Sequence, residues 1–563
     1  MIAAFCLVTL MAAAPQSVSY QGPPPPQAPP RDANGPKGTA AIKGKIVAAD
    51  SGRALRRVQV SVSSPDLTET RSMSTTAQGL FEFKDLPAGR YTLTATRSGY
   101  IRLQYGQRRP GEPGRPITLD DGQHFEKADL ALPRTGSIAG RITDEVGDPL
   151  ADVSIFPAQW RYFRGKRRLV PVSGGGPFNR TDDTGQYRIT GLEPGDYIVL
   201  ATTRTTWTVD DKPTERIGFS PTYSGGTTNP GEAVPVTVAM GQEAAMADFA
   251  MVPGRVASIA GTATYASGLP LAGETINMTQ EFAGPGASSS FGMNGGKINP
   301  DGTFLIKNVA PGEYRLSVRG PGDKDHPPEG MTLTVTLSGE DLTGVTLVTG
   351  SGGTLSGRVV SDTGAPIPLP EQSRMRVTAR PVDPTTTYTS FDNDNGRVKD
   401  DMTFEVTNAY GLNKLSIAPL PTGWALKSIE YGGRDYADIP MEFRGGQRVD
   451  NVTITLSKSL PRIRGTLQDD TGRPIEGSVL IFPEDSAKWG EDARLVRSAR
   501  PDESGTFEFR NVIPGSYLAT ALEYVRDGQW SDPEFLTRLR DQAKPVKVDD
   551  GGIATVALTL KRQ

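Results

Sequence analysis

The sequence predicts an all-β chain, organised as a tandem array of five Ig-like or transthyretin-like antiparallel β-sandwich domains. Two patterns predict this fold: a hairpin motif with one apolar face that recurs along the chain, and a strand-opening glycine that recurs five times. Composition agrees, because 64 glycines and 46 prolines in 563 residues, with few long apolar periodic runs, favour turns and strands over helices.

The clearest copy of the hairpin motif is residues 299–318, NPDGTFLIKNVAPGEYRLSV. Asp301-Gly302 predicts a tight turn, and the apolar residues that alternate after it predict a half-buried strand. Pro311-Gly312 fits the two central positions of a type II turn, and a second strand with apolar residues at every other position follows. Similar hairpins are expected at residues 78–91, 183–197 and 504–517. Because two strands bury too little apolar surface to be stable alone, each hairpin needs further strands packed on its apolar face.

A strand that contains an apolar residue, a spacer and a glycine opens each repeat. The five opening glycines are Gly44, Gly140, Gly261, Gly357 and Gly465, at spacings of 96, 121, 96 and 108 residues. Solenoid repeats are much shorter, whereas an autonomous sandwich domain has about this length. Five opening glycines therefore predict five domains.

These paired signatures resemble the carboxypeptidase regulatory-like family, a small transthyretin-like β-sandwich that bacteria string together in secreted and envelope proteins. The resemblance rests on GDPL at 147–150, GLPL at 268–271 and GRPI at 472–475, together with the Gly-x-Phe and Pro-Gly-x-Tyr elements of the hairpins. The first repeat lacks the proline in GRAL at 52–55, and the fourth lacks Pro-Gly-x-Tyr. The resemblance implies domains that accompany peptidases, without the catalytic part, and extends to starch-binding-like sandwiches.

The expected organisation has seven parts. They are a signal peptide (1–19), a proline-rich linker (20–40), and β-sandwiches one (41–132), two with a loop insertion (137–252), three (257–348), a divergent four (353–456) and five (461–560). Sandwich five carries the one good helix signal, since Ser531-Asp532 can cap a helix that has Pro533 in its first turn and continues to about Gln542. The hairpin tyrosines are expected to bury their rings and to hydrogen-bond nearby backbone: Tyr91, Tyr197, Tyr314 and Tyr517.

The N-terminus predicts export to the periplasm, the cell surface or the medium. Residues 2–14 are apolar but too few to span a bilayer, and they end in small residues that a signal peptidase accepts. No basic residue precedes this run, so an apolar tail without a signal role is the alternative. Cys6 is the only cysteine and would leave with the signal. The mature chain is then expected to have no disulfide and no membrane span.

Composition argues against several function classes. A net charge of −3 provides no basic field for nucleic acid. The two histidines, His124 and His326, lie in different repeats, so neither a Ser-His-Asp triad nor a zinc site is expected, and no cofactor is implied. The run from Asp392 to Gly396 resembles the start of a calcium loop, but Thr403 stands where the loop glutamate should be, which favours a solvated turn.

The function predicted is non-catalytic binding or adhesion, with a carbohydrate or an envelope protein as partner. A structural spacer that docks by edge-strand pairing and an unrecognised carboxylate hydrolase remain as alternatives. The candidate ligand-binding residues are the aromatic and basic side chains of sandwich two that have the fewest structural constraints: Trp160, Tyr162, Arg164, Arg167 and Trp207. Aromatic rings stack on sugars and arginines bond hydroxyls or acidic groups. The alternative is that Trp160 and Tyr162 only pack their loop, residues 156–179, onto the sheet.

Overall fold

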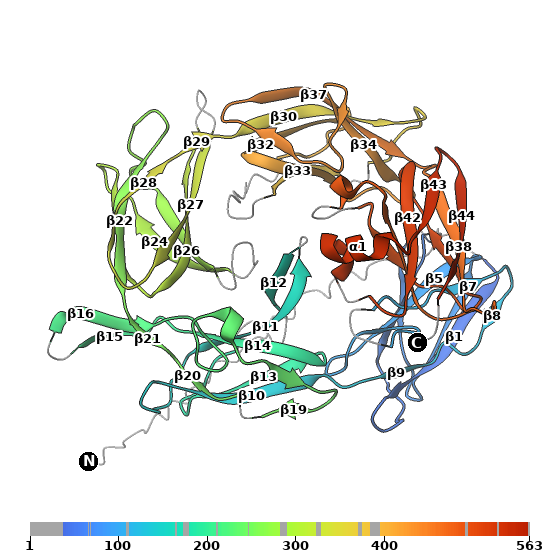
Figure 1. Cartoon of the computed structure of the whole chain (residues 1–563), viewed down its shortest axis with the longest axis horizontal. Coiled ribbons are helices and arrows are strands. Elements are labelled where there is room, and N and C mark those ends of the chain that lie inside the picture. Colours follow the sequence, from blue (N-terminus) through green and yellow to red (C-terminus); the bar gives the residue numbers. More distant parts are fainter. Residues whose placement is uncertain are drawn as a thin grey trace, which may run out of the picture.

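The computed structural model describes residues 38–560 except 66, 68, 109–111, 164–165, 173–178, 210–211, 246, 282–289, 323–327, 370–373, 383–394, 490–493 and 526–527. The expected signal peptide and nearly all of the proline-rich linker therefore lie outside the described residues, as do His326 and Asp392. The regular secondary structure of the described chain is almost entirely β-strand. Its sheets follow one another around a ring, so that the C-terminal strands lie beside the N-terminal ones (Figure 1). We number the five expected sandwiches as units one to five in chain order.

Unit one has two sheets that enclose a continuous apolar core. Its strands are β1 (Ala40–Ala48), β2 (Gln59–Ser63), β3 (Arg71–Ser74), β4 (Leu80–Leu86), β5 (Gly89–Thr96), β6 (Leu103–Gln104), β7 (Ile117–Leu119), β8 (His124–Phe125) and β9 (Leu130–Leu132). Residue 40, assigned to the linker from the sequence, is already part of β1.

In addition to its two sandwich sheets, unit two contains a hairpin at residues 206–219 that belongs to a separate sheet. Its elements are β10 (Gly136–Thr143), β11 (Ser154–Phe163), β12 (Lys166–Pro171), β13 (Gln186–Leu192), β14 (Gly195–Thr202), β15 (Thr206–Val209), β16 (Lys212–Phe219), β17 (Thr222–Tyr223), η1 (Pro230–Glu232), β18 (Val236–Val238), β19 (Glu243–Ala244) and β20 (Phe249–Ala250). The stretch 156–179 was expected to be a loop, but most of its described part forms β11 and β12, which pair antiparallel.

Units three and four each pack a three-stranded sheet on a five-stranded one. Unit three contains β22 (Ala257–Thr264), β23 (Thr275–Glu281), β24 (Ser290–Lys297), β25 (Thr303–Val309), β26 (Gly312–Gly320), β27 (Glu329–Leu337) and β28 (Leu342–Val348). Unit four contains β30 (Gly353–Ser361), β31 (Arg376–Pro381), β32 (Thr403–Ala409), β33 (Gly411–Ala418), β34 (Ala425–Tyr431), β35 (Arg434–Asp435), β36 (Met441–Phe443) and β37 (Arg448–Ser457).

Unit five combines two sheets with short helices. Its elements are β38 (Arg462–Gln468), β39 (Ser478–Pro483), η3 (Ser486–Lys488), β40 (Arg497–Ala499), β41 (Thr506–Phe509), β42 (Gly515–Leu522), η4 (Gln529–Ser531), α1 (Pro533–Arg540), β43 (Lys544–Val548) and β44 (Ile553–Thr559). The expected helix is confirmed as α1: the Asp532 side chain accepts a hydrogen bond from Glu534 N, and Leu536 and Leu539 are buried. It ends at Arg540, two residues earlier than expected.

Strands also form in two of the connections, between units two and three and between units three and four. β21 (Pro253–Arg255), between units two and three, pairs with β16. β29 (Gly350–Ser351), between units three and four, pairs with β27. Each of these linkers is therefore held by backbone pairing to the unit that precedes it.

Every unit has parallel pairing where antiparallel pairing was expected, and in units one and two a second short strand, β8 or β19, also pairs parallel with the first strand. The first strand of each unit pairs parallel with its last strand, in β1·β9, β10·β20, β22·β28, β30·β37 and β38·β44. The opening glycine lies on that first strand. At all five positions a Cβ atom would collide with a backbone carbonyl oxygen of the chain on that side, from Ala128, Ala247, Val345, Val452 and Val556 in chain order. The repeated glycine is therefore explained by close approach of two backbones.

The hairpin turn also differs from the expected type II geometry. Gly312 has a φ of 156°, which is nearly extended, and the left-handed residue is Asn308 at 59°. Every unit has such a residue at the equivalent position: Asp85, Gly191, Asn308, Asn408 and Asn511, with φ between 54° and 78°. Asn, Asp and Gly are the residues that adopt this conformation at least cost. Unit four keeps this residue although it lacks Pro-Gly-x-Tyr.

The role expected for the hairpin tyrosines is confirmed. Each hydroxyl donates to the carbonyl oxygen four residues earlier, over distances of 2.6 to 2.9 Å, in Tyr91, Tyr197, Tyr314 and Tyr517. All four rings are buried. These side chains fix the turn against the core and are structural.

Candidate functional site

The β11–β12 hairpin carries most of the side chains proposed from the sequence. Trp160 is 37% exposed, and the guanidinium carbon of Arg167 lies 5.3 Å from the centroid of its ring. The structure therefore brings these two residues together as a cation–π pair on an exposed surface. Tyr162 lies on β11 opposite Arg167 in the strand register, but its side chain is outside the described set, as is the whole of Arg164.

Trp207 does not join this surface. It lies on β15, in a separate sheet made by β15, β16 and β21. Its ring packs on Phe219 with centroids 4.9 Å apart, against the core of unit two. Trp489 of unit five also lies in a polar stretch of the sequence, but it is 2% exposed and donates its ring N–H to the carbonyl oxygen of Pro483 at 2.6 Å. Trp207 and Trp489 thus have structural contacts that their polar sequence surroundings did not reveal.

The β11–β12 hairpin points toward the middle of the ring, where α1 of unit five also lies (Figure 1). β11 reaches η4 of unit five, so this hairpin contacts a unit that is not its neighbour in the chain. The hairpin that carries the exposed Trp160–Arg167 pair therefore extends toward the interior of the ring.

A cleft of about 710 Å³ separates units two and three. Unit two contributes Arg180 and the chain from Thr202 to Thr206, and unit three contributes its hairpin turn, Ile306–Ala310. The described lining includes three basic side chains, Arg180, Arg204 and Lys307, and one acidic side chain, Asp152. Its volume is within the range of small-molecule sites, and its excess of positive charge favours an anion.

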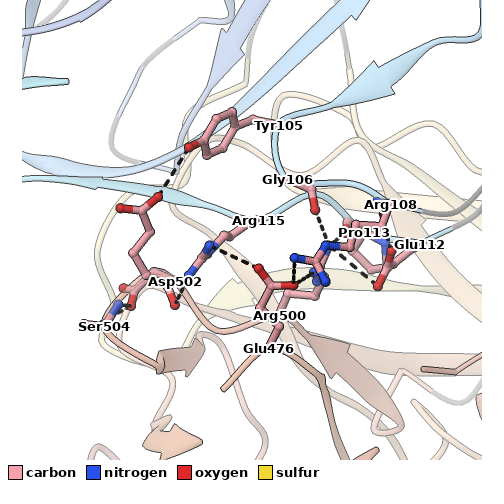
Figure 2. Close-up of polar contacts among 11 residues, drawn as sticks. Tyr105, Gly106, Arg108, Glu112, Pro113, Arg115, Glu476, Arg500, Asp502 and Ser504 are labelled. Atoms are coloured by element: carbon pink, nitrogen blue, oxygen red, sulfur yellow. Dashed lines mark hydrogen bonds and ion pairs between the residues drawn. The ribbon is translucent and has the colours of Figure 1, made fainter. Parts of the chain in front are cut away.

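The first and last units meet at a junction that is rich in charge (Figure 2). Arg500 of unit five is 5% exposed and donates to the carbonyl oxygens of Gly106 and Pro113 in unit one, at 2.7 and 3.3 Å. Its Nη1 also lies 3.6 Å from Oε1 of Glu112, whose side chain is 6% exposed. Burial lowers the pKa of Arg500, and the carboxylates of Glu112 and Glu476 oppose that shift. Arginine nevertheless stays protonated in proteins, so Arg500 carries its positive charge in this buried contact with Glu112.

A second set of contacts surrounds this pair (Figure 2). Arg115 donates to the backbone oxygen of Asp502 at 3.2 Å, and Arg108 pairs with Glu476 at 2.7 Å. The hydroxyl of Tyr105 donates to Glu503 at 3.3 Å. The Thr118 hydroxyl, which is not drawn in Figure 2, donates to the carboxylate of Asp502 at 3.0 Å. Residues nearly 400 positions apart in the sequence thus close the ring.

Unit five also contacts unit four through an ion pair and hydrogen bonds. Arg494 binds Asp438 through two nitrogens, at 2.8 and 3.1 Å, and donates to the carbonyl oxygen of Leu426 at 2.6 Å. A bidentate arginine–carboxylate pair has a defined geometry, which fixes orientation as well as distance. Unit five is therefore held from both sides.

Comparison with known proteins supports the resemblance stated above for part of the chain. Residues 41–133 match the family model for the carboxypeptidase regulatory-like domain. No curated protein matches the chain. Similar solved structures include the minor pilin GBS52 of Streptococcus agalactiae (14% identity, 38% of this chain and 95% of that one, TM-score 0.22) and the Bacillus anthracis TIE protein (10%, 76% and 74%, 0.15). The major pilin subunit BcpA of Bacillus cereus is another (12%, 55% and 99%, 0.14). With TM-scores this low, the likeness carries no argument about function.

The described part of the chain contains few groups that could support catalysis or bind a metal. His124 lies on β8 and is exposed. No three His, Cys, Asp or Glu side chains gather there in a way that could hold a metal ion. No described helix is long and apolar enough to cross a membrane.

Proposed function

We propose that this protein is a non-catalytic binding scaffold of the cell envelope or the extracellular space, built from five β-sandwich domains (41–132, 137–252, 257–348, 353–456 and 461–560) closed into a ring. The observation that carries the proposal is the junction of units one and five, where Arg500 and Glu112 are buried together. The partner proposed is a carbohydrate or another envelope component, and export through residues 1–19 is part of the same proposal.

Ring closure favours binding over a spacer role. A spacer needs only length, and it gains nothing when its two ends are in contact. The closing junction removes two charged side chains from water, which is tolerable because each finds charged or carbonyl partners. What closure provides is a fixed arrangement of loops and clefts from different units, and binding surfaces that are already ordered lose less entropy when a ligand binds.

Two observations point to where binding would occur. The exposed Trp160–Arg167 pair lies on a hairpin that points toward the middle of the ring, and the cleft between units two and three carries excess positive charge. An aromatic ring beside a guanidinium suits the apolar face and the hydroxyls of a sugar. Among the described residues, neither surface offers a nucleophile paired with a base, which is why we propose binding without turnover.

The proposal is tested in two steps on the purified mature chain. Small-angle X-ray scattering should give the radius of gyration of a closed ring in physiological salt; dimensions of an extended five-domain string would contradict the scaffold. Glycan arrays and pull-downs from envelope fractions should then detect a ligand that is recovered unchanged. Release of cleaved glycan or peptide products would instead support the hydrolase alternative.

A further inference from the structure

Arg180 of unit two and Arg500 of unit five occupy equivalent places in the repeated hairpin. Each stands five residues before the turn glycine, Gly185 or Gly505. Each also faces the next unit around the ring, because Arg180 lines the cleft toward unit three and Arg500 lines the junction with unit one. The repeat therefore places a guanidinium at the same position in two different junctions.

The two arginines differ in the charge that the neighbouring unit presents to them. Arg500 meets the buried carboxylate of Glu112, which unit one supplies. Arg180 meets no carboxylate from unit three among the described lining residues, since that unit presents Lys307. Arg180 forms an ion pair with Asp152 of its own unit, at 3.3 Å, and both side chains are more than half exposed. Such a surface pair contributes little, so Arg180 can change partner at low cost.

The rest of the cleft adds hydroxyls and apolar surface. Thr202, Thr203, Thr205 and Thr206 line it on the unit two side, beside Phe219. Lys307 is exposed and has no ion-pair partner among the described residues. A ligand that carries carboxylates supplies the charge that Glu112 supplies in the other junction, and a ligand that also carries hydroxyls can bond the threonines.

We propose that the cleft between units two and three binds an acidic polysaccharide segment, with Arg180 and Lys307 contacting uronate carboxylates and the threonines contacting sugar hydroxyls. This site rests on the proposed binding function and names its ligand class. A cleft of about 710 Å³ suits a short oligosaccharide rather than a single acid.

The test uses trigalacturonate and isothermal titration on the full mature chain at low salt. We expect binding, and we expect Lys307→Glu and Arg180→Ala each to weaken it about tenfold or more, because each removes a cation that faces the carboxylates. Lys84→Glu is the matched control. Lys84 stands directly before the left-handed residue of its turn, as Lys307 does, but lies in unit one. It should leave affinity within about twofold.

Several outcomes would overturn the cleft site. They are no binding of trigalacturonate, equal loss with Lys84→Glu, or neutral galactotriose binding as tightly as the acid. A pentaglutamate peptide that binds as tightly would assign the cleft to acidic peptides and refute the sugar. If other glycans bind the chain and both cleft variants leave them unaffected, the scaffold proposal stands and this site fails; if no glycan or envelope component binds, both fail.

Discussion

Arg500 in the last sandwich and Glu112 in the first lie 3.6 Å apart, and both side chains are almost completely buried although the rest of the chain separates them. Neither charge could remain there alone, because an unpaired buried ion costs several kcal/mol. Opening the junction would separate the pair, so this buried ion pair is one of the contacts that favour closure of the ring.

The first prediction concerns this pair. Arg500→Ala should open the junction or cost about 3–5 kcal/mol of stability, because it leaves Glu112 buried without its cation. Small-angle scattering should show a larger radius of gyration, and thermal unfolding should begin earlier. Arg108→Ala is the control, since Arg108 is 70% exposed in its ion pair with Glu476, and it should cost less than about 1 kcal/mol. Equal effects of the two variants would show that closure does not depend on the buried pair.

The second prediction concerns pH. Glu508 lies in unit five among Arg462, Arg464 and Arg510. Burial alone would raise its pKa, but hydrogen bonds and charge from Arg510 and Arg464 outweigh burial and bring the pKa to about 2.

Because the folded pKa of Glu508 lies below the unfolded value, its contribution to stability is complete above about pH 4.5 and is lost as pH falls toward 2. Glu508→Gln should therefore be less stable than the parent at pH 6, and the difference should shrink between pH 4.5 and 2. Chemical denaturation across that range measures it. A stability difference that stays constant with pH would refute the assignment.

The third prediction concerns the opening glycines. Gly261→Ala should destabilise unit three by about 3 kcal/mol, because the new Cβ would collide with the backbone carbonyl of Val345 on the parallel strand and neither backbone can move freely. Gly350→Ala introduces the same methyl group where no atom lies within 4 Å, and should be nearly neutral. Denaturant unfolding of the two variants compares them; similar losses would mean that the close approach is not what selects glycine.

The fourth prediction separates exposed from buried tryptophan. Trp160→Ala with Tyr162→Ala should leave the melting temperature nearly unchanged, since Trp160 is 37% exposed, and should reduce glycan binding if the hairpin contacts the ligand. Trp489→Ala should cost about 3–5 kcal/mol, because it empties a buried site and frees the Pro483 carbonyl. A large loss of stability in the Trp160 variant would assign that side chain to packing alone.

The sequence revealed much of the local structure because turns and strands are specified by neighbouring residues. Asp301-Gly302, the hairpin tyrosines and the Asp532-Pro533 helix start were each interpretable within a few positions. The type II turn was wrong for the same reason that it was plausible: Pro311-Gly312 satisfies that turn locally, but the structure places the left-handed residue at Asn308. The recurrence of Asn, Asp or Gly at that position was a signal available in the sequence.

The candidate site was harder to predict from the sequence than the local structure. Trp160 and Arg167 were proposed together and are together, since they lie on one hairpin. Trp207 was grouped with them by its polar surroundings, yet it packs on Phe219, because a polar sequence context does not show which face of a strand meets the core. The clefts between units were not predicted from the sequence, because each is made by segments from two units.

By itself the sequence determined that this protein is an all-β chain, and it predicted five units from their opening glycines, because alternation and turn residues act over a few positions. Only the tertiary structure decided that the first strand of each unit pairs parallel with its last, and that Arg500 meets Glu112 to close the ring. Those contacts join residues from about 80 to nearly 400 positions apart. Their formation depends on the complementarity of two folded surfaces, which no local pattern in the sequence records.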